Sequence, residues 1–170
     1  MNKKKGILLS IQFLVFCILI WFDQFTKKLA VVNLKGQSDH IIWENVFRLH
    51  YLENHGAAFG MLQDQIVFFI VIAAVILFFV GYALIRLPAE KHFYAIQFLL
   101  VAIASGAVGN MIDRVSNRYV VDFFYFSLIN FPVFNVADIY VTVGTFVLIF
   151  FILFVYKEED LQLLMPTKDR

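Results

Sequence analysis

The chain has 170 residues, of which 61% are hydrophobic and only 16% are charged, against roughly 25% charged residues in an average soluble domain. Its mean hydropathy of +0.78 and net charge of +1 indicate a membrane protein and exclude a nucleic-acid-binding role. The length suits a single domain, residues 1–170, and the lone Cys17 excludes an intramolecular disulfide and a cysteine-based metal site.

Four apolar stretches, at residues 6–25, 66–85, 93–112 and 136–156, are each long enough to cross a bilayer. About 20 residues of helix extend about 30 Å, which is the thickness of the hydrocarbon layer. The first stretch follows a basic start, MNKKK, as in a secretory signal, but no cleavage site of small residues follows it. We therefore interpret it as a retained membrane helix.

The connections between these stretches differ in length and character. Residues 27–65 are largely polar, and the alternation in IIWENVFRLHYLEN is typical of short strands, which predicts a small extracytoplasmic sheet lying on the membrane. Residues 86–92 form a tight turn, and residues 113–135 form a second extracytoplasmic segment. The predicted fold is therefore an all-α membrane protein with four transmembrane helices and a small β-sheet.

Lysine and arginine residues set the orientation of such a protein in the membrane. The face that carries both termini and the 86–92 turn holds eight bases against five acids, whereas the opposite face holds six bases against eight acids. Both termini are therefore predicted to be cytoplasmic.

Unusual polar residues all fall at the outer surface in this topology. DQFTK closes the first helix with Asp23 four residues before Lys27, the favourable order for a helical ion pair, and by itself fits an interfacial anchor. NHGAAFG begins at Asn54 and contains Gly56. It fits either a turn into the second helix or a backbone that closely approaches a ligand.

The third helix ends in SGAVGNMIDR. Gly106, Asn110 and Arg114 recur every four residues, so they share one helix face, and its small residues allow a neighbouring helix to come close. Asp113 lies beside Arg114. This pair is either part of a site or an anchor to lipid headgroups.

The segment between the last two helices begins near Asp122 and ends with FNVAD, in which Asn135 can cap the fourth helix and Asp138 lies in its first turn. Asp122 lies among valine and phenylalanine residues, with no base within three positions. Two carboxylates brought together in apolar surroundings cannot both ionise easily, so the pair shares a proton and can activate a water for attack on an amide. The helix end favours an ionised Asp138 and leaves Asp122 more often protonated.

Together DQFTK, NHGAAFG, GNMIDR, VVDFF and FNVAD, in this order on four spans, resemble the motif set of bacterial lipoprotein signal peptidase (signal peptidase II) over about residues 10–156. The resemblance implies an integral-membrane aspartic endopeptidase of the bacterial cell membrane. Such enzymes remove signal peptides from prolipoproteins, cutting before a cysteine that carries diacylglycerol. It also implies a short interfacial helix beside the four helices and the sheet, and no cofactor.

By motif match, Asp122 and Asp138 correspond to the catalytic pair of that family. The implied partners are diacylglyceryl-modified prolipoproteins, membrane lipid and the cyclic-peptide inhibitor globomycin, and no nucleic acid. The other matched positions would support the site or hold substrate or inhibitor: Asp23, Lys27, Asn54, Gly56, Asn110, Asp113, Arg114 and Asn135.

Other chemistries lack the residues that they need. A rhomboid-type serine protease needs a histidine base at membrane depth, but none of the four histidines lies within a predicted span. A metalloprotease needs ligand spacing such as HExxH, which the chain lacks, so no metal site is predicted. The remaining alternative is a small membrane transporter or channel, although its acids would be expected near mid-bilayer rather than at one surface.

Overall fold

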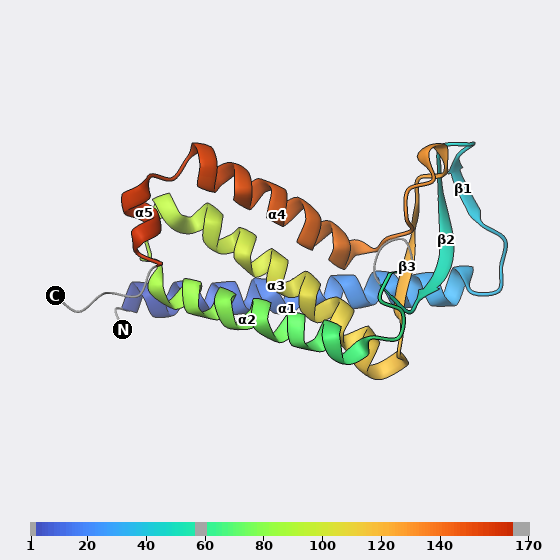
Figure 1. The fold of residues 1–170 in the computed structure, drawn as a ribbon, viewed down its shortest axis with the longest axis horizontal. Helices are drawn as coiled ribbons and strands as arrows, with labels where there is room; N and C mark the ends of the chain where they lie inside the picture. The colour runs from blue at the N-terminus through green and yellow to red at the C-terminus, as the bar shows by residue number, and fades with distance from the viewer. Residues whose placement is uncertain (1–2, 57–60, 165–170) are drawn as a thin grey trace.

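The structure, a computed structural model, describes residues 3–56 and 61–164. Four long helices run roughly alongside one another, and a three-stranded antiparallel sheet lies across one end of them (Figure 1). This arrangement confirms the fold class predicted from the sequence. Residues 57–60, the second half of the NHGAAFG motif, lie outside the described residues, as do three of the charged residues used to predict the orientation, Lys168, Asp169 and Arg170.

The four helices are each long and apolar enough to cross a membrane. Two of them extend beyond the predicted spans, so the first residues of both predicted outer segments, 27–65 and 113–135, are helical. Hydropathy marks the end of an apolar run, whereas a helix continues until a residue such as Gly36, at φ +73°, breaks its hydrogen bonding. The helices are α1 (Lys3–Leu34), α2 (Ile66–Arg86), α3 (Lys91–Asn117) and α4 (Val136–Phe154).

Helix α3 is central, because it contacts each of the other three long helices. The predicted stripe of small residues lies against α4, and a Cβ atom added at Gly106 would overlap the carbonyl oxygen of Ala137 and lie 2.8 Å from Cγ2 of Val141. Ser105 is fully buried and donates to the carbonyl of Val101 at 2.8 Å, as expected of a packing residue. This close packing places the end of α3 directly beside the start of α4.

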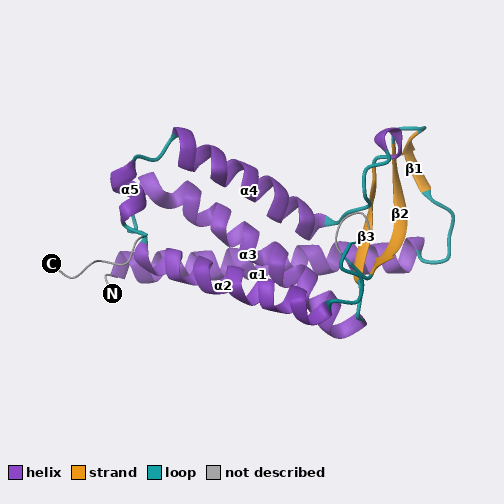
Figure 2. Cartoon of the chain, viewed as in Figure 1, coloured by secondary structure: helices purple, strands orange, loops and turns teal. Residues whose placement is uncertain are grey.

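The sheet has the order β1-β2-β3, with strands β1 (His40–Trp43), β2 (Phe47–Asn54) and β3 (Val120–Tyr125) (Figure 2). The alternating pattern of residues 27–65 predicted the first two strands, whereas β3 was not predicted. β3 pairs with β2 in a register that places Asp122 opposite Leu52. Val121 and Phe123 on β3 pack with residues of α1 in a buried apolar cluster, which fixes the sheet to the helices.

Two short helices complete the described chain. The single turn η2 (Ser127–Ile129) lies in the predicted outer segment. Helix α5 (Glu158–Gln162), which was not predicted, lies at the end of the bundle opposite the sheet, near the start of α1 (Figure 1). Asp160 of α5 contacts the ring of His92 at 3.1 Å, at the start of α3.

Candidate active site

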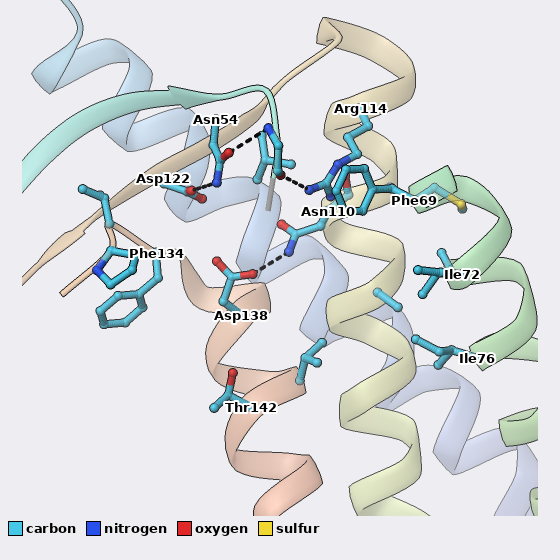
Figure 3. Close-up of a pocket in the computed structure, with 18 of the residues that line it drawn as sticks. Asn54, Phe69, Ile72, Ile76, Asn110, Arg114, Asp122, Phe134, Asp138 and Thr142 are labelled. Carbon is cyan, nitrogen blue, oxygen red and sulfur yellow. Dashed lines mark hydrogen bonds between the residues drawn. The ribbon is translucent and has the colours of Figure 1, made fainter. Parts of the chain in front are cut away.

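A cavity of about 380 Å³ lies where α2, α3 and α4 meet the sheet. Asp122 from β3 and Asp138 from α4 both line it, and their carboxylates face the same space (Figure 3). The wall on the side of α2 is apolar and includes Phe69, Ile72 and Ile76. The two carboxylates, here called the aspartate pair, therefore lie at the polar end of an otherwise apolar cavity.

Asp122 is 1% exposed, and two amide groups donate to its carboxylate. Asn54 Nδ2 lies 2.8 Å from one oxygen, and Asn135 Nδ2 lies 2.6 Å from the other. Burial raises the pKa of Asp122 to about 7, and the nearby charge of Asp138 adds to the increase. This is the carboxyl group that sequence analysis predicted to be more often protonated.

Asp138 forms a capping box with Asn135 at the start of α4. The backbone N–H of Asp138 donates to Asn135 Oδ1 at 3.0 Å, and the backbone N–H of Asn135 donates to Asp138 Oδ2 at 3.1 Å. The second oxygen of Asp138 accepts a hydrogen bond from Asn110 Nδ2 at 2.7 Å. The predicted capping role is therefore confirmed, and it coexists with a position on the cavity.

Asn110 and Asn135 connect the two carboxylates through their amides. Asn135 is fully buried, and its Nδ2 lies 3.1 Å from Asn110 Oδ1 as well as close to Asp122. Each aspartate is thus held by amide donors, and the donors are themselves joined. Such a network fixes the orientation of both carboxylates, because each amide has its partners assigned.

Arg114 and Asn54 hold the turn that follows β2. Arg114 Nη2 donates to the carbonyl of Gly56 at 2.9 Å, and its guanidinium lies 4.0 Å from the centre of the Phe69 ring. Asn54 Oδ1 accepts from the backbone N–H of Gly56 at 2.9 Å. Arg114 also lines the cavity, so it is part of the site rather than an anchor to headgroups alone.

Arg114→Lys should therefore lower the catalytic efficiency, kcat/KM, of the peptide hydrolysis that the sequence motifs predict. Lysine keeps the charge but loses the planar fork that bonds Gly56 while stacking on Phe69. We expect kcat/KM to fall by roughly tenfold to a hundredfold, the effect of losing one or two charge-assisted hydrogen bonds. The matched control is Arg118→Lys, because Arg118 is exposed at the same end of α3. Equal steady-state efficiency of the two variants would contradict this role.

Asp23, Lys27 and Asp113 lie behind the aspartate pair rather than on the cavity. Lys27 is 3% exposed, and its ammonium lies 2.9 Å from Asp23 and 3.0 Å from Asp113. The interpretation of DQFTK as an interfacial anchor is therefore wrong. The spacing predicted the ion pair, but the packing of α3 against α1 buries it, and that contact between distant parts of the chain leaves no local pattern.

Sequence analysis missed one polar residue of this region, Gln24. Its Nε2 lies 3.0 Å from Asp113 Oδ1 and 3.1 Å from both Asp23 Oδ2 and the carbonyl of Gly109. The signal was present, since Gln24 stands inside the DQFTK motif. Within the described ranges, no group of three His, Cys, Asp or Glu side chains is arranged to hold a metal ion.

The raised pKa of Asp122 makes stability depend on pH. Below pH 4 this carboxyl is protonated in folded and unfolded protein alike, but above pH 7 the folded protein must bury an ionised carboxylate. The free energy of unfolding should therefore decrease between pH 4 and pH 7 by on the order of 4 kcal/mol, since the pKa is raised from 3.8 to about 7. Thermal melting in detergent across this range measures the decrease. Asp122→Asn should lack the part of this decrease that comes from Asp122. An identical pH dependence in variant and parent would refute the assignment of the decrease to Asp122.

Comparisons with known proteins agree with this geometry. The family model described as signal peptidase (SPase) II matches residues 15–154. The lipoprotein signal peptidase of Caldanaerobacter subterraneus subsp. tengcongensis is 43% identical over 141 residues, covering 82% of this chain and 94% of that protein. The lipoprotein signal peptidase of Streptococcus pyogenes serotype M5 is 36% identical over 159 residues, covering 93% and 97%.

A solved structure gives the same result for the fold. It is described as a bacterial membrane enzyme structure determined by the in meso method at 2.3 Å resolution. It is 28% identical to this chain, with a TM-score of 0.75, and the match covers 88% of this chain and 93% of that one. The cavity, the bundle and the sequence matches agree: the chain belongs to the signal peptidase II family, as its motifs predicted.

Proposed function

We propose that this protein is an aspartic endopeptidase that removes signal peptides from prolipoproteins, with Asp122 and Asp138 as its catalytic pair. The observation that carries the proposal is the placement of both carboxylates on one cavity, at one end of a membrane-spanning bundle. The family match and the names of the curated relatives support the peptidase activity. The transporter or channel alternative is not favoured, because the relatives are named as peptidases.

The chemistry follows from one proton shared by two carboxyl groups. The ionised carboxylate takes a proton from a water as the water oxygen bonds to the carbonyl carbon of the scissile amide, and the protonated carboxyl donates to the carbonyl oxygen. When the resulting tetrahedral intermediate collapses, the C–N bond breaks and the amide nitrogen leaves with a proton from the pair. The contacts of Asp138 with the first turn of α4 support its role as the ionised member, and the raised pKa of Asp122 supports the role of acid.

The cavity also supports a lipid-modified substrate. Ile76 of α2 and Thr142 of α4 line it on the side of the pair that leads along the helices (Figure 3). Both helices are apolar enough to span a membrane, which supports the proposal that this part of the cavity is at the depth of acyl chains. A precursor held in the bilayer by diacylglycerol on its cysteine would reach the aspartate pair without leaving the lipid. The inhibitor globomycin, a cyclic peptide, is proposed to occupy the same cavity.

The orientation is proposed from charge. The start of α1 and helix α5 lie at one end of the bundle, and the aspartate pair lies at the other (Figure 1). The basic residues Lys3, Lys4 and Lys5 mark the first of these ends. By the positive-inside rule, that end is cytoplasmic and the pair acts at the extracytoplasmic surface of the bacterial cell membrane.

Cleavage of a diacylglyceryl-modified prolipoprotein by the purified protein tests the proposal. We expect the modified precursor to be cut before its cysteine and the same precursor without lipid to remain intact under identical conditions. Globomycin should block the cleavage, and Asp122→Asn, purified in parallel, accounts for contaminating proteases. Equal cleavage of both precursors would refute the requirement for lipid, and cleavage of neither would refute the proposed activity.

A further inference from the structure

The ammonium of Lys27 contacts three polar groups, two buried carboxylates and the half-buried amide of Asn110. Its Nζ lies 2.9 Å from Asp23, 3.0 Å from Asp113 and 2.9 Å from Oδ1 of Asn110. Both carboxylates are almost fully buried, with Asp23 at 0% and Asp113 at 3% exposure. A buried ammonium with three partners from two helices is held in one position, because breaking a contact with either buried carboxylate would leave an uncompensated charge. We call these four residues the lysine cluster.

The two carboxylates of the lysine cluster each hold a backbone N–H next to the aspartate pair. Asp23 Oδ1 accepts from the N–H of Ala137 at 3.0 Å, and Asp113 Oδ2 accepts from the N–H of Val121 at 3.1 Å. Ala137 immediately precedes Asp138, and Val121 immediately precedes Asp122. The same arrangement thus occurs twice, once on α4 and once on β3. A single ammonium fixes both carboxylates and therefore the backbone on both sides of the pair.

Asn110, the third partner of Lys27, connects the ammonium to the aspartate pair more directly. Asn110 Oδ1 accepts from Lys27, and its Nδ2 donates to Asp138 Oδ1 at 2.7 Å. An amide whose oxygen is held by an ammonium must present its NH₂ group on the other side, which here faces Asp138. The charge of Lys27 therefore sets which face of Asn110 meets the carboxylate. Reversal of the amide would place two oxygens against each other and an NH₂ group against the ammonium.

From these contacts we infer that Lys27 is a positioning residue of the peptidase reaction: it sets the separation and the electrostatic environment of Asp122 and Asp138 through Asp23, Asp113 and Asn110. The inference rests on the proposed function, because it assumes that the pair is catalytic. Lys27 does not line the cavity, so it acts through its neighbours rather than on the substrate. Nothing in the DQFTK spacing alone would distinguish this role from an ordinary helical ion pair.

The charged groups around the aspartate pair are few, so the electrostatic effect of Lys27 on the pair can be distinguished from theirs. Of the described residues that line the cavity, those with charged side chains are Asp122, Asp138 and Arg114. Helix α1 adds Lys27 and Asp23, and α3 adds Asp113, all from behind the pair. Helix α2 contributes apolar side chains to the lining. Loss of Lys27 therefore removes positive charge from behind the pair, while Arg114 still lines the cavity.

Lys27→Met tests the inference, with Lys28→Met as the matched control because Lys28 is exposed on the same helix turn. Methionine keeps the length of the side chain and removes its charge and donors. Burial raises the pKa of Asp122 and the charge of Lys27 opposes part of that increase, so loss of Lys27 should move the pH optimum of kcat upward. We expect kcat per folded molecule to fall by about tenfold to a hundredfold, with KM within about twofold of the parent. Lys28→Met should leave both unchanged.

A parent-like kcat and pH optimum in folded Lys27→Met would overturn the inference. A loss of folded protein with an unchanged pH profile per folded molecule would also overturn it, because that result describes a purely structural ion pair. If Lys27→Met does not fold, Asp113→Asn serves in its place. Asparagine can still accept from Val121 but removes negative charge, so the pH optimum should move downward, and an unmoved optimum refutes the inference.

The outcome for Lys27 can be separated from that for the aspartate pair. With Asp122→Asn inactive and Lys27→Met behaving as the parent does, only the positioning role fails and the catalytic assignment remains. An active Asp122→Asn, by contrast, would remove the assignment on which the inference rests.

Discussion

Asp122→Asn and Asp138→Asn are each expected to lower kcat for lipidated prolipoprotein by roughly 10⁴-fold. Asparagine keeps the size of aspartate and can still accept hydrogen bonds from Asn54 or Asn110. It can neither take a proton from water nor give one to the carbonyl oxygen. Because both carboxylates take part in the same proposed proton transfers, loss of either one should remove almost all of the activity, and the double variant should be little worse than each single one.

The matched control for these variants is Glu44→Gln, which removes an exposed acid at the same end of the molecule. It should cleave as the parent does. Thermal melting in detergent establishes that each variant is folded, and Asp122→Asn should melt no lower than the parent above pH 7, since it no longer buries a charge. Turnover near the parent rate in either aspartate variant, once purified and folded, would contradict the catalytic pair.

Gly106→Ala should destabilise the protein, because the added methyl group falls in the contact between α3 and α4. The new Cβ would overlap the carbonyl of Ala137 and crowd Val141, so α3 and α4 must separate. Overpacking of this kind costs about 1–3 kcal/mol. The site should also suffer, because Ala137 precedes Asp138 and the N–H of Ala137 is held by Asp23.

Gly81→Ala is the matched control, since a Cβ at Gly81 meets nothing within 4 Å. There alanine should be neutral or stabilising by about 0.5–1 kcal/mol, because it favours the helix without crowding a neighbour. Melting temperatures of the two variants in one detergent give the comparison. A Gly106→Ala protein that melts at or above the temperature of Gly81→Ala would show that the two helices are not as closely packed as described.

The helices and two of the strands could be predicted because their signals are local. An apolar run of about 20 residues marks a membrane span, and alternation marked β1 and β2. The sequence of β3, VVDFFY, is apolar on both faces apart from Asp122, so it lacks that alternation. Its partner β2 lies two membrane helices earlier in the chain. No local pattern records a pairing over that distance.

The candidate site was predictable in its members but not in its arrangement. Asp122 stood out because an acid without a nearby base is unusual in an apolar segment, and Asn135 and Asp138 form the predicted cap. The lysine cluster was not predicted as such. Whether Lys27 reaches lipid headgroups or Asn110 depends on which face of α1 packs against α3, and only the folded chain determines that.

The pairing of β2 with β3 has a consequence for biosynthesis. Asp122 gains its partner Asn54 only after two further membrane helices have been made and the strands on either side of them have met. Asp138 lies in the last of the four membrane helices, whose start is held by Asp23 of the first. If Asp138 has the catalytic role proposed above, a nascent chain that is still missing α4 lacks one of its two catalytic carboxylates. On the proposed function, the site is therefore complete only after α4 has been inserted and has packed against α1 and α3.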